Sequence, residues 1–322
     1  MKLFVLLILS AISFIPNSAQ INDTYKNKEK KELAITFDDL PAVVVTSDIK
    51  ALKTNTQNLL SALIKHKVPA IGFVNECKLY EDSTYIQPRA DLLRMWLEAG
   101  MLLGNHTYSH IDMNSTPLDN YEKDVLNGET TIKKLLAEKG QKPEFFRPPF
   151  LHIGTSIEGR NSFENFLHNH GYRMAPVTID NSEWIFARAY LNAKQKSDSL
   201  MMKKIAETYI PYMEQKFEYF EKQSVELFGH NIKQILLLHA NELNADHFNE
   251  LAQMIENRGY KFITLSEALK DSAYSSPDTY TGRGGITWLH RWAITRKVNK
   301  AFFKGEPMTP AFILKEAGVD EE

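Results

Sequence analysis

Cysteine is nearly absent from this sequence, which has a single one, Cys77, in 322 residues. One cysteine excludes an intramolecular disulfide framework and a cysteine-based zinc site, so any metal must be held by His, Asp or Glu. Cys77 is expected to be a small half-buried residue rather than a catalytic thiol. An excess of one charge is also missing, because 38 Lys and Arg face 40 Asp and Glu, for a formal net charge of −2. We therefore exclude nucleic acid as a partner.

The sequence also lacks a hydrophobic run long enough for a membrane span. The apolar run Leu3–Ile15 is shorter than the roughly 20 residues that a bilayer requires. It follows one positive charge and precedes proline and small polar residues, which is typical of a secretory signal peptide cut between Ala19 and Gln20; an uncleaved anchor is the alternative. We predict a signal peptide at residues 1–19, a polar linker at residues 20–31, and a secreted or periplasmic mature chain without an integral membrane domain.

What remains is an ordinary globular composition, with 43% hydrophobic and 24% charged residues, which excludes disordered, collagen-like and coiled-coil proteins. Short β-rich apolar stretches alternate with segments whose apolar residues recur at helical spacing. This alternation predicts an α/β fold with a mainly parallel sheet, as a barrel or an open doubly wound sheet. The predicted strands are Leu33–Phe37, Val68–Val74, Met101–Gly104, Glu144–Arg147, Tyr172–Val177, Gln234–Leu238 and Lys261–Leu265. The predicted helices include Asp48–His66, Ala90–Ala99, Leu118–Lys139, Asn161–His170 and Asn244–Arg258.

A helical insertion interrupts the alternation at about residues 185–233. Its middle, Lys194–Phe228, is strongly helical in pattern, and Pro211 is expected to kink or split it. The barrel domain that contains the insertion is predicted to extend over residues 32–270.

A C-terminal extension follows at residues 271–322. Its stretch Tyr280–Gly305 has six Lys or Arg and no Asp or Glu. We expect this extension to pack on the barrel through Trp288 and Trp292; a basic rim for an anionic polymer is the alternative.

Polar residues cluster at the ends of the predicted strands, where parallel α/β proteins place their active sites. The first strand ends in Asp38 and Asp39, adjacent carboxylates that repel each other unless a cation neutralises one or their partners differ. A solvated pair in a turn is the alternative. After the third strand come His106 and His110, whose spacing predicts one face of a helical turn and a shared zinc-like ion.

Later strands end in further candidates. Arg147 follows the fourth strand and precedes two prolines that hold the backbone rigid, which suits a guanidinium paired with a carboxylate. A structural salt bridge is the alternative. The fifth strand leads into Asp180 and the sixth into His239, which is a candidate general acid or base or else a core histidine.

Five segments, in their order along the chain, resemble the motifs of the polysaccharide deacetylases of carbohydrate esterase family 4. They are Thr36–Asp39, His106–His110, Arg147–Phe150, Asp180–Trp184 and Leu237–His239. The resemblance covers about residues 32–270 and implies a distorted (β/α) barrel with about seven parallel strands. It also implies a metal-dependent hydrolase that removes acetyl groups from an N-acetylglucosamine-containing glycan, such as peptidoglycan, a chitin-like polymer or poly-N-acetylglucosamine.

The resemblance assigns roles to the first three motifs. Asp39, His106 and His110 would hold a divalent metal, zinc foremost, with cobalt, nickel or manganese as alternatives. Asp38 would be the general base that takes a proton from the attacking water. Arg147 would orient Asp38.

The remaining motifs would complete the site. His239 would protonate the departing amine, because an amide nitrogen is a poor leaving group without a proton. A backbone N–H near Phe150 would stabilise the oxyanion. Trp184 and Leu237 would form the walls of the pocket for the acetyl methyl group.

The chain departs from the family pattern at two positions. The family usually has Asp directly before the tryptophan, as partner of the acid histidine, and this chain has Glu183. Either Glu183 or Asp180 is therefore a candidate partner for His239. Ala240 stands where the family often has an aspartate.

Other functions are compatible with the same motifs. An O-acetyl esterase of the xylan type would use the same metal site, because the chemistry differs mainly in how much leaving-group protonation it needs. A catalytically silent glycan-binding relative and a metal-binding structural barrel are the alternatives from other classes. In each catalytic interpretation the expected partner is a glycan.

Overall fold

The computed structural model describes residues 31–322. The predicted signal peptide and residues 20–30 of the predicted linker lie outside the described residues. Strand β1 (Lys31–Leu40) begins at the last residue of that linker. Within the described part of the chain, no helix is both long and apolar enough to cross a membrane.

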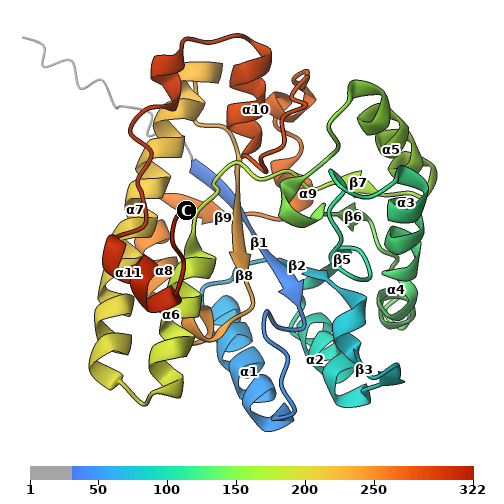
Figure 1. The fold of residues 1–322 in the computed structure, drawn as a ribbon, viewed down its shortest axis with the longest axis vertical. Coiled ribbons are helices and arrows are strands. Elements are labelled where there is room, and N and C mark those ends of the chain that lie inside the picture. The colour runs from blue at the N-terminus through green and yellow to red at the C-terminus, as the bar shows by residue number, and fades with distance from the viewer. Residues whose placement is uncertain (1–30) are drawn as a thin grey trace, which may run out of the picture.

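A curled, parallel sheet of seven strands forms the centre of the molecule, with helices around it (Figure 1). Its order is β7-β6-β5-β2-β1-β8, and β9 pairs with the start of β1. A bridge between Ile179 and Leu236 brings the segment after β7, at one edge, to β8 at the other. The predicted (β/α) barrel with seven parallel strands is thus confirmed, in a half-barrel form. The strands after β1 are β2 (Ile71–Val74), β5 (Leu102–Asn105), β6 (Phe145–Phe146), β7 (Arg173–Met174), β8 (Gln234–His239) and β9 (Tyr260–Phe262).

Strand β1 lies at the centre of the sheet and pairs with β2, β8 and β9. Its apolar residues from Leu33 to Phe37 are buried on both faces, which is why the strand has a continuous apolar run rather than an alternating one. In the register with β8, Asp38 stands opposite His239. The pairing of these two strands therefore places two of the candidate site residues side by side.

The predicted helices pack their apolar stripes on the sheet. Helix α1, for example, begins at Asp48, whose side chain accepts a hydrogen bond from the Ala51 N–H at 3.0 Å, and buries Leu52, Leu59 and Leu63. A small hairpin of β3 (Tyr80–Glu81) and β4 (Thr84–Tyr85), which was not predicted, follows β2. The helices of the barrel are α1 (Ile49–Lys65), α2 (Gln87–Glu98), α3 (Leu118–Asn127), α4 (Thr130–Ala137), α5 (Ile157–Asn169) and α8 (Glu242–Asn257).

The single helix predicted over residues 118–139 is two helices, α3 and α4, separated at Gly128. A Cβ at Gly128 would lie 2.5 Å from the carbonyl carbon of Thr107 and 2.6 Å from the nitrogen of Tyr108. The Tyr108 N–H also donates to the carbonyl of Asp124, at 3.0 Å. Glycine is required here because the end of α3 packs directly on the loop that follows β5, and the prediction of one helix is wrong for that reason.

The insertion consists of α6 (Glu183–Gln195) and α7 (Ser199–Phe228). Helix α7 continues through Pro211, so, of the expected kink or split, the split is wrong. Proline removes one backbone hydrogen bond, but buried side chains on either side of it, Tyr209, Tyr212 and Met213, anchor both halves of the helix.

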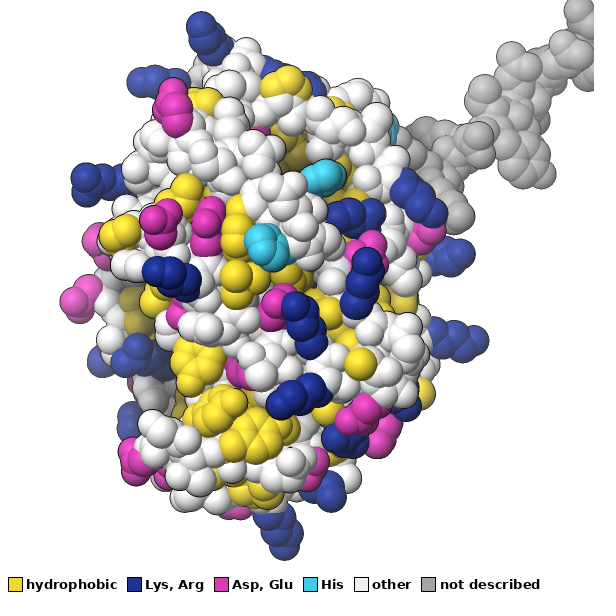
Figure 2. Space-filling model, turned by 90° about the vertical axis from the view of Figure 1, so that its right-hand side faces the viewer, with side chains coloured by type: hydrophobic (Ala, Val, Ile, Leu, Met, Phe, Trp, Pro, Cys, Tyr) yellow, Lys and Arg dark blue, Asp and Glu magenta, His cyan; other side chains and the backbone are white. Residues whose placement is uncertain are grey.

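Helix α9 (Leu265–Ala268) lies just before the C-terminal extension. The extension itself contains α10 (Trp288–Thr295) and α11 (Ala311–Ala317). Trp288 and Trp292 are 7% and 2% exposed, and the Trp288 N–H donates to the carbonyl of Val177 at 2.8 Å. Of the basic residues in this extension, Arg291 is buried and its Nε donates to Asp278 at 2.7 Å. Figure 2 shows basic and acidic side chains interspersed on the face that carries α3, α4 and α5.

Gly285, in the extension, packs on the loop that carries Phe150. A Cβ at Gly285 would lie 1.7 Å from the Phe150 carbonyl oxygen, whereas a Cβ at Gly284 would meet nothing closer than 3.5 Å. We predict that Gly285→Ala lowers the free energy of unfolding by about 1–3 kcal/mol and that Gly284→Ala lowers it by less than about 0.5 kcal/mol. Chemical denaturation of both variants measures the difference, and equal stabilities would contradict this packing.

Candidate active site

Three side chains that can bind a metal converge at the carboxyl ends of β1 and β5. One ligand atom from each of Asp39, His106 and His110 lies within 4.8 Å of the other two. Asp39 Oδ1 is 3.8 Å from His106 Nε2 and 3.5 Å from His110 Nε2. This oxygen is buried and has no hydrogen-bond partner among residues 31–322. A buried carboxylate oxygen facing two imidazole nitrogens fits a divalent cation such as zinc.

The two histidines are held in the form that binds metals. Nδ1 of His106 lies 2.6 Å from the carbonyl oxygen of Arg147, so Nδ1 donates its proton there and Nε2 keeps its lone pair. Burial lowers the pKa of His106 to about 4, against the opposing effect of nearby carboxylates. Burial also lowers the pKa of His110. Both rings are therefore neutral at pH 7 and need lose no proton to bind a cation.

Asp39 is held ionised in an unusual backbone conformation. Burial raises the pKa of Asp39, but Lys78 and the neighbouring histidines lower it to about 2. Its φ of 69° is left-handed, a conformation that costs a non-glycine residue about 1–3 kcal/mol and that clusters at functional sites.

The loop of His106 and His110 is not the helical turn that their spacing predicted. Residues 106–117 contain no helix, and Thr107 and His110 have φ values of 67° and 56°. The Thr107 N–H donates to Asn105 Oδ1 at 2.8 Å, and the His110 N–H donates to Thr107 Oγ1 at 3.0 Å. Side-chain acceptors inside the loop thus replace helical hydrogen bonds. The prediction of a helical turn is therefore wrong. Both imidazoles nevertheless face Asp39.

Asp38 and Arg147 form a buried ion pair beside the cluster. Arg147 is fully buried, and its Nη1 lies 3.3 and 3.4 Å from the two carboxylate oxygens of Asp38. Its Nη2 donates to Thr36 Oγ1 at 3.1 Å and its Nε donates to the carbonyl of Ala175 at 2.6 Å. Because three hydrogen-bonded groups hold the guanidinium, it fixes the orientation of the Asp38 carboxylate. Asp38 Oδ2 lies 3.8 Å from His106 Nε2.

His239 ends β8 and is paired with Glu183, the first residue of α6. His239 Nδ1 lies 2.9 Å from Glu183 Oε2, while Glu183 Oε1 accepts hydrogen bonds from the side-chain amides of Asn241 and Asn244. Burial lowers the pKa of His239, but the hydrogen bond and the charge of Glu183 outweigh it and raise the pKa to about 9. His239 is therefore protonated at neutral pH.

Glu183, and not Asp180, is brought into hydrogen-bond contact with His239. Asp180 Oδ1 accepts instead from the backbone N–H of Asn181, at 2.8 Å. Burial raises the pKa of Asp180 to about 6, although Lys216 opposes the rise. The structure therefore contradicts Asp180 as the partner of His239, because its carboxylate is engaged by its own loop.

Two exposed aromatic side chains and one buried leucine accompany these polar groups. Phe150 and Trp184 are 53% and 44% exposed, and Leu237 is 9% exposed. Phe150 has a left-handed φ of 57°, and its ring centroid lies 4.6 Å from that of His110. Exposed aromatic residues next to a polar cluster indicate a binding surface.

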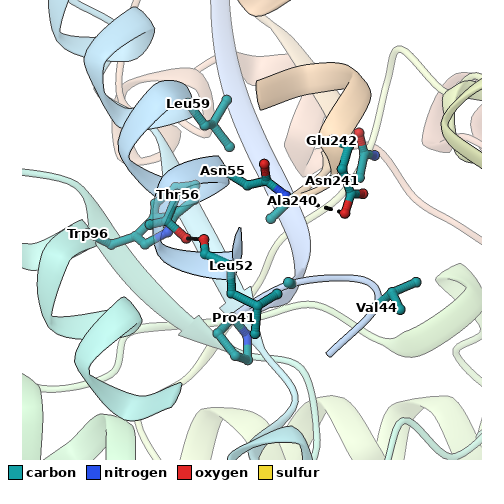
Figure 3. A pocket seen from close by; sticks show the side chains of 11 residues that line it. Pro41, Val44, Leu52, Asn55, Thr56, Leu59, Trp96, Ala240, Asn241 and Glu242 are labelled. Carbon is teal, nitrogen blue, oxygen red and sulfur yellow. Dashed lines mark hydrogen bonds between the residues drawn. The ribbon is translucent and has the colours of Figure 1, made fainter. Parts of the chain in front are cut away.

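A small cavity adjoins the site, between α1 and the loops that follow β1 and β8 (Figure 3). Its volume of about 20 Å³ has room for a water molecule but not for a sugar ring. Asn55 of α1 crosses it to donate to Glu242 Oε1 at 3.3 Å (Figure 3). This cavity is therefore too small to be the binding site of a saccharide.

The predicted site residues do not include Lys78, Asn241 and Asn244. Asn241 had a usable signal, because an asparagine directly after a strand and before a helical pattern predicts an N-cap, and its side chain does accept from the Asn244 N–H at 3.0 Å. Lys78 had none. Cys77 is partly buried, and burial raises its pKa, so it stays a thiol at neutral pH.

Comparison with known proteins shows which family and which relatives this chain is similar to. Residues 25–175 match the family model described as polysaccharide deacetylase. A peptidoglycan-N-acetylglucosamine deacetylase of Listeria monocytogenes is 22% identical over 255 residues, which are 79% of this chain and 42% of that protein. A chitin deacetylase of Colletotrichum lindemuthianum is 21% identical over 243 residues, 74% of this chain and 80% of that protein. An uncharacterized 30.6 kDa protein of Geobacillus stearothermophilus is 25% identical over 251 residues, 78% of this chain and 76% of that protein.

The fold is also shared with a solved structure. A mutant of a Bacillus anthracis CE4 family pseudoenzyme, described as having restored enzymatic activity, superposes with a TM-score of 0.50 at 18% identity, over 74% of this chain and 68% of that chain. At this identity the likeness concerns the fold alone. The family model over residues 25–175 and the deacetylases among these sequence relatives support the polysaccharide deacetylase family, carbohydrate esterase family 4.

Proposed function

We propose that this chain is a secreted, metal-dependent deacetylase that hydrolyses the N-acetyl groups of an N-acetylglucosamine-containing glycan to free amine and acetate. The observation that carries the proposal is Asp39 Oδ1, which faces the two neutral imidazoles and has no hydrogen-bond partner among residues 31–322. Peptidoglycan, a chitin-like polymer and poly-N-acetylglucosamine are the candidate substrates. The names of the Listeria and Colletotrichum relatives specify peptidoglycan and chitin. Secretion is inferred from the apolar run Leu3–Ile15.

Asp39, His106 and His110 would hold the divalent cation, zinc foremost, with cobalt, nickel or manganese as alternatives. Bound there, the cation would polarise the acetyl carbonyl and make water easier to deprotonate. Three protein ligands leave coordination positions for water and substrate.

The chain's own groups would perform the proton transfers. Asp38 would accept a proton from the attacking water at its carboxylate, in the orientation that Arg147 fixes. A backbone N–H near Phe150 would stabilise the oxyanion. His239 would then donate the proton of Nε2 to the leaving nitrogen, since its Nδ1 is already engaged by Glu183. Trp184 and Leu237 would be the walls around the acetyl methyl group.

The state of His239 favours an amide substrate over an ester. A sugar amine leaves only when its nitrogen is protonated, whereas an O-acetyl ester needs less help from an acid. With a pKa raised to about 9 by Glu183, His239 has a proton to give at neutral pH. An O-acetyl esterase is therefore the second candidate.

Glu183→Gln is expected to move the alkaline limb of the pH profile of kcat/KM to lower pH by at least about one unit. The protonated acid is present below the pKa of His239 and is lost as the pH rises through it. Glutamine lacks the charge that raises this pKa to about 9, so the proton is lost sooner. Asp180→Asn is the comparison variant and should shift the limb less; a larger shift in Asp180→Asn would reverse the assignment of the partner.

The proposed function is tested by acetate release. Purified protein is incubated with N-acetylglucosamine oligomers, peptidoglycan and acetylated xylan. Each substrate is tested without chelator, with chelator, and, in a separate incubation, with added zinc. Chelator-sensitive acetate from an N-acetylated glycan is the expected result. Release from xylan alone would favour the esterase, and no release from any of them by zinc-loaded protein would favour a silent glycan binder.

A further inference from the structure

Lys78 lies beside the metal cluster and takes no part in the reaction proposed above. It belongs to the short 3-10 helix η1 (Glu76–Leu79), which follows β2, and its side chain is 19% exposed. Its Nζ donates to the carbonyl oxygens of Asp39 and Ala42, each at 3.2 Å, and to that of Val43 at 3.4 Å. A single ammonium group therefore ties together the loop that leaves β1.

The same ammonium distinguishes the two carboxylate oxygens of Asp39. Oδ2 lies 3.5 Å from Lys78 Nζ, while Oδ1 faces His106 and His110 and has no hydrogen-bond partner among the described residues. Lys78 thus contacts both the backbone and the side chain of Asp39, at the residue whose φ of 69° is left-handed. An ammonium has three donors, and the three carbonyl oxygens accept from them, so the contact with Oδ2 at 3.5 Å is an ion pair.

We propose that Lys78 is a positioning residue that makes Asp39 a one-oxygen metal ligand, by engaging Oδ2 and the carbonyl oxygens of the loop so that Oδ1 alone faces the cation. The inference rests on the metal site of the proposed function. A carboxylate that bound through both oxygens would occupy a further coordination position, and catalytic sites need open positions for water and substrate. Outer groups of this kind orient the ligands of many metal sites.

A purely structural role for Lys78 would have a different signature. If Lys78 only tied down the loop, its loss would lower the stability of the metal-free protein and leave the affinity and coordination of the bound metal unchanged. The positioning role predicts changes in both the affinity and the coordination of the bound metal. The readouts are therefore the zinc Kd, the visible absorption spectrum of the cobalt form, and thermal unfolding in chelator.

The test compares Lys78→Met with Lys53→Met, a control at an exposed position of α1. Competition with a chromophoric chelator gives the zinc Kd of the full chain. Lys78→Met is expected to raise the Kd by about 10–100-fold and Lys53→Met by less than about twofold. The intensity of the cobalt spectrum, which reports coordination number, should change in Lys78→Met alone. Lys78→Arg, which keeps the positive charge, should lie closer to the wild type than Lys78→Met does.

Folded Lys78→Met with the zinc Kd and cobalt spectrum of the wild type would overturn the inference. If Lys78→Met does not fold, Lys78→Gln replaces it, and the same two outcomes decide. Failure of the proposed function is distinguishable, because the wild type itself would then bind no zinc; that result overturns both the proposed function and the role of Lys78.

Discussion

Asp38→Asn is expected to lower kcat by about 10²–10⁴-fold while zinc stays bound with close to the wild-type affinity. Asp38 is not one of the three clustered ligands, and its carboxylate is engaged by Arg147 Nη1 at 3.3 Å. Asparagine keeps the shape of this side chain but cannot accept a proton from water. Acetate release under substrate saturation measures kcat, and competition with a chelator measures the zinc Kd of the same preparation.

Asp38→Asn also affects stability, and the design must separate the two effects. Arg147 is fully buried, and a buried charge that loses its partner lowers the free energy of unfolding by about 3–5 kcal/mol. Activity is therefore measured well below the Tm of the variant. Arg147→Lys is the matched control, because it disturbs the same ion pair but keeps Asp38. It should lose much less activity than Asp38→Asn. Folded Asp38→Asn with nearly wild-type kcat would contradict the role of Asp38 as the base.

His110→Ala is expected to raise the zinc Kd by more than about 100-fold, beyond the range typical for the loss of an outer-shell partner. His110 is the better choice for removal because its side chain is 29% exposed, whereas that of His106 is 2% exposed and is bonded to the Arg147 carbonyl. The metal content after dialysis and the zinc Kd both report the effect. His168→Ala, at an exposed position of α5, is the control, and an unchanged zinc Kd in His110→Ala would disprove the ligand assignment.

The parts of the fold that the sequence predicts are those that depend on local pattern. The apolar run of β1 ends in Asp38 and Asp39, and in a parallel sheet the ends of all strands meet at one edge. This is why the position of the candidate site follows from the strand order without any knowledge of side-chain contacts. The seven strands were predictable for the same reason.

The parts that the sequence does not predict depend on contacts between distant segments. Gly128 interrupts a helical pattern because of the loop at Thr107, and no local signal indicates that contact. The spacing of His106 and His110 equally suits a helix, and only the left-handed residues between β5 and α3 bring about the observed loop. The contact of Lys78 with Asp39, and the choice between Glu183 and Asp180, likewise depend on tertiary packing.

The pairing of β1 with β8 has a consequence for the order in which the protein assembles. Thr36 Oγ1 donates to the carbonyl of Leu236 at 2.8 Å, across 200 residues of chain. Pairings of such long range form late and slow folding, because the loop they close is costly in entropy. A ribosome must synthesise the chain past β8 before β1 can pair on that side, and β8 also carries His239. We therefore expect that every chain truncated before β8, including one ending near residue 175 where the match to the family model stops, lacks both the complete sheet and His239, the proposed acid.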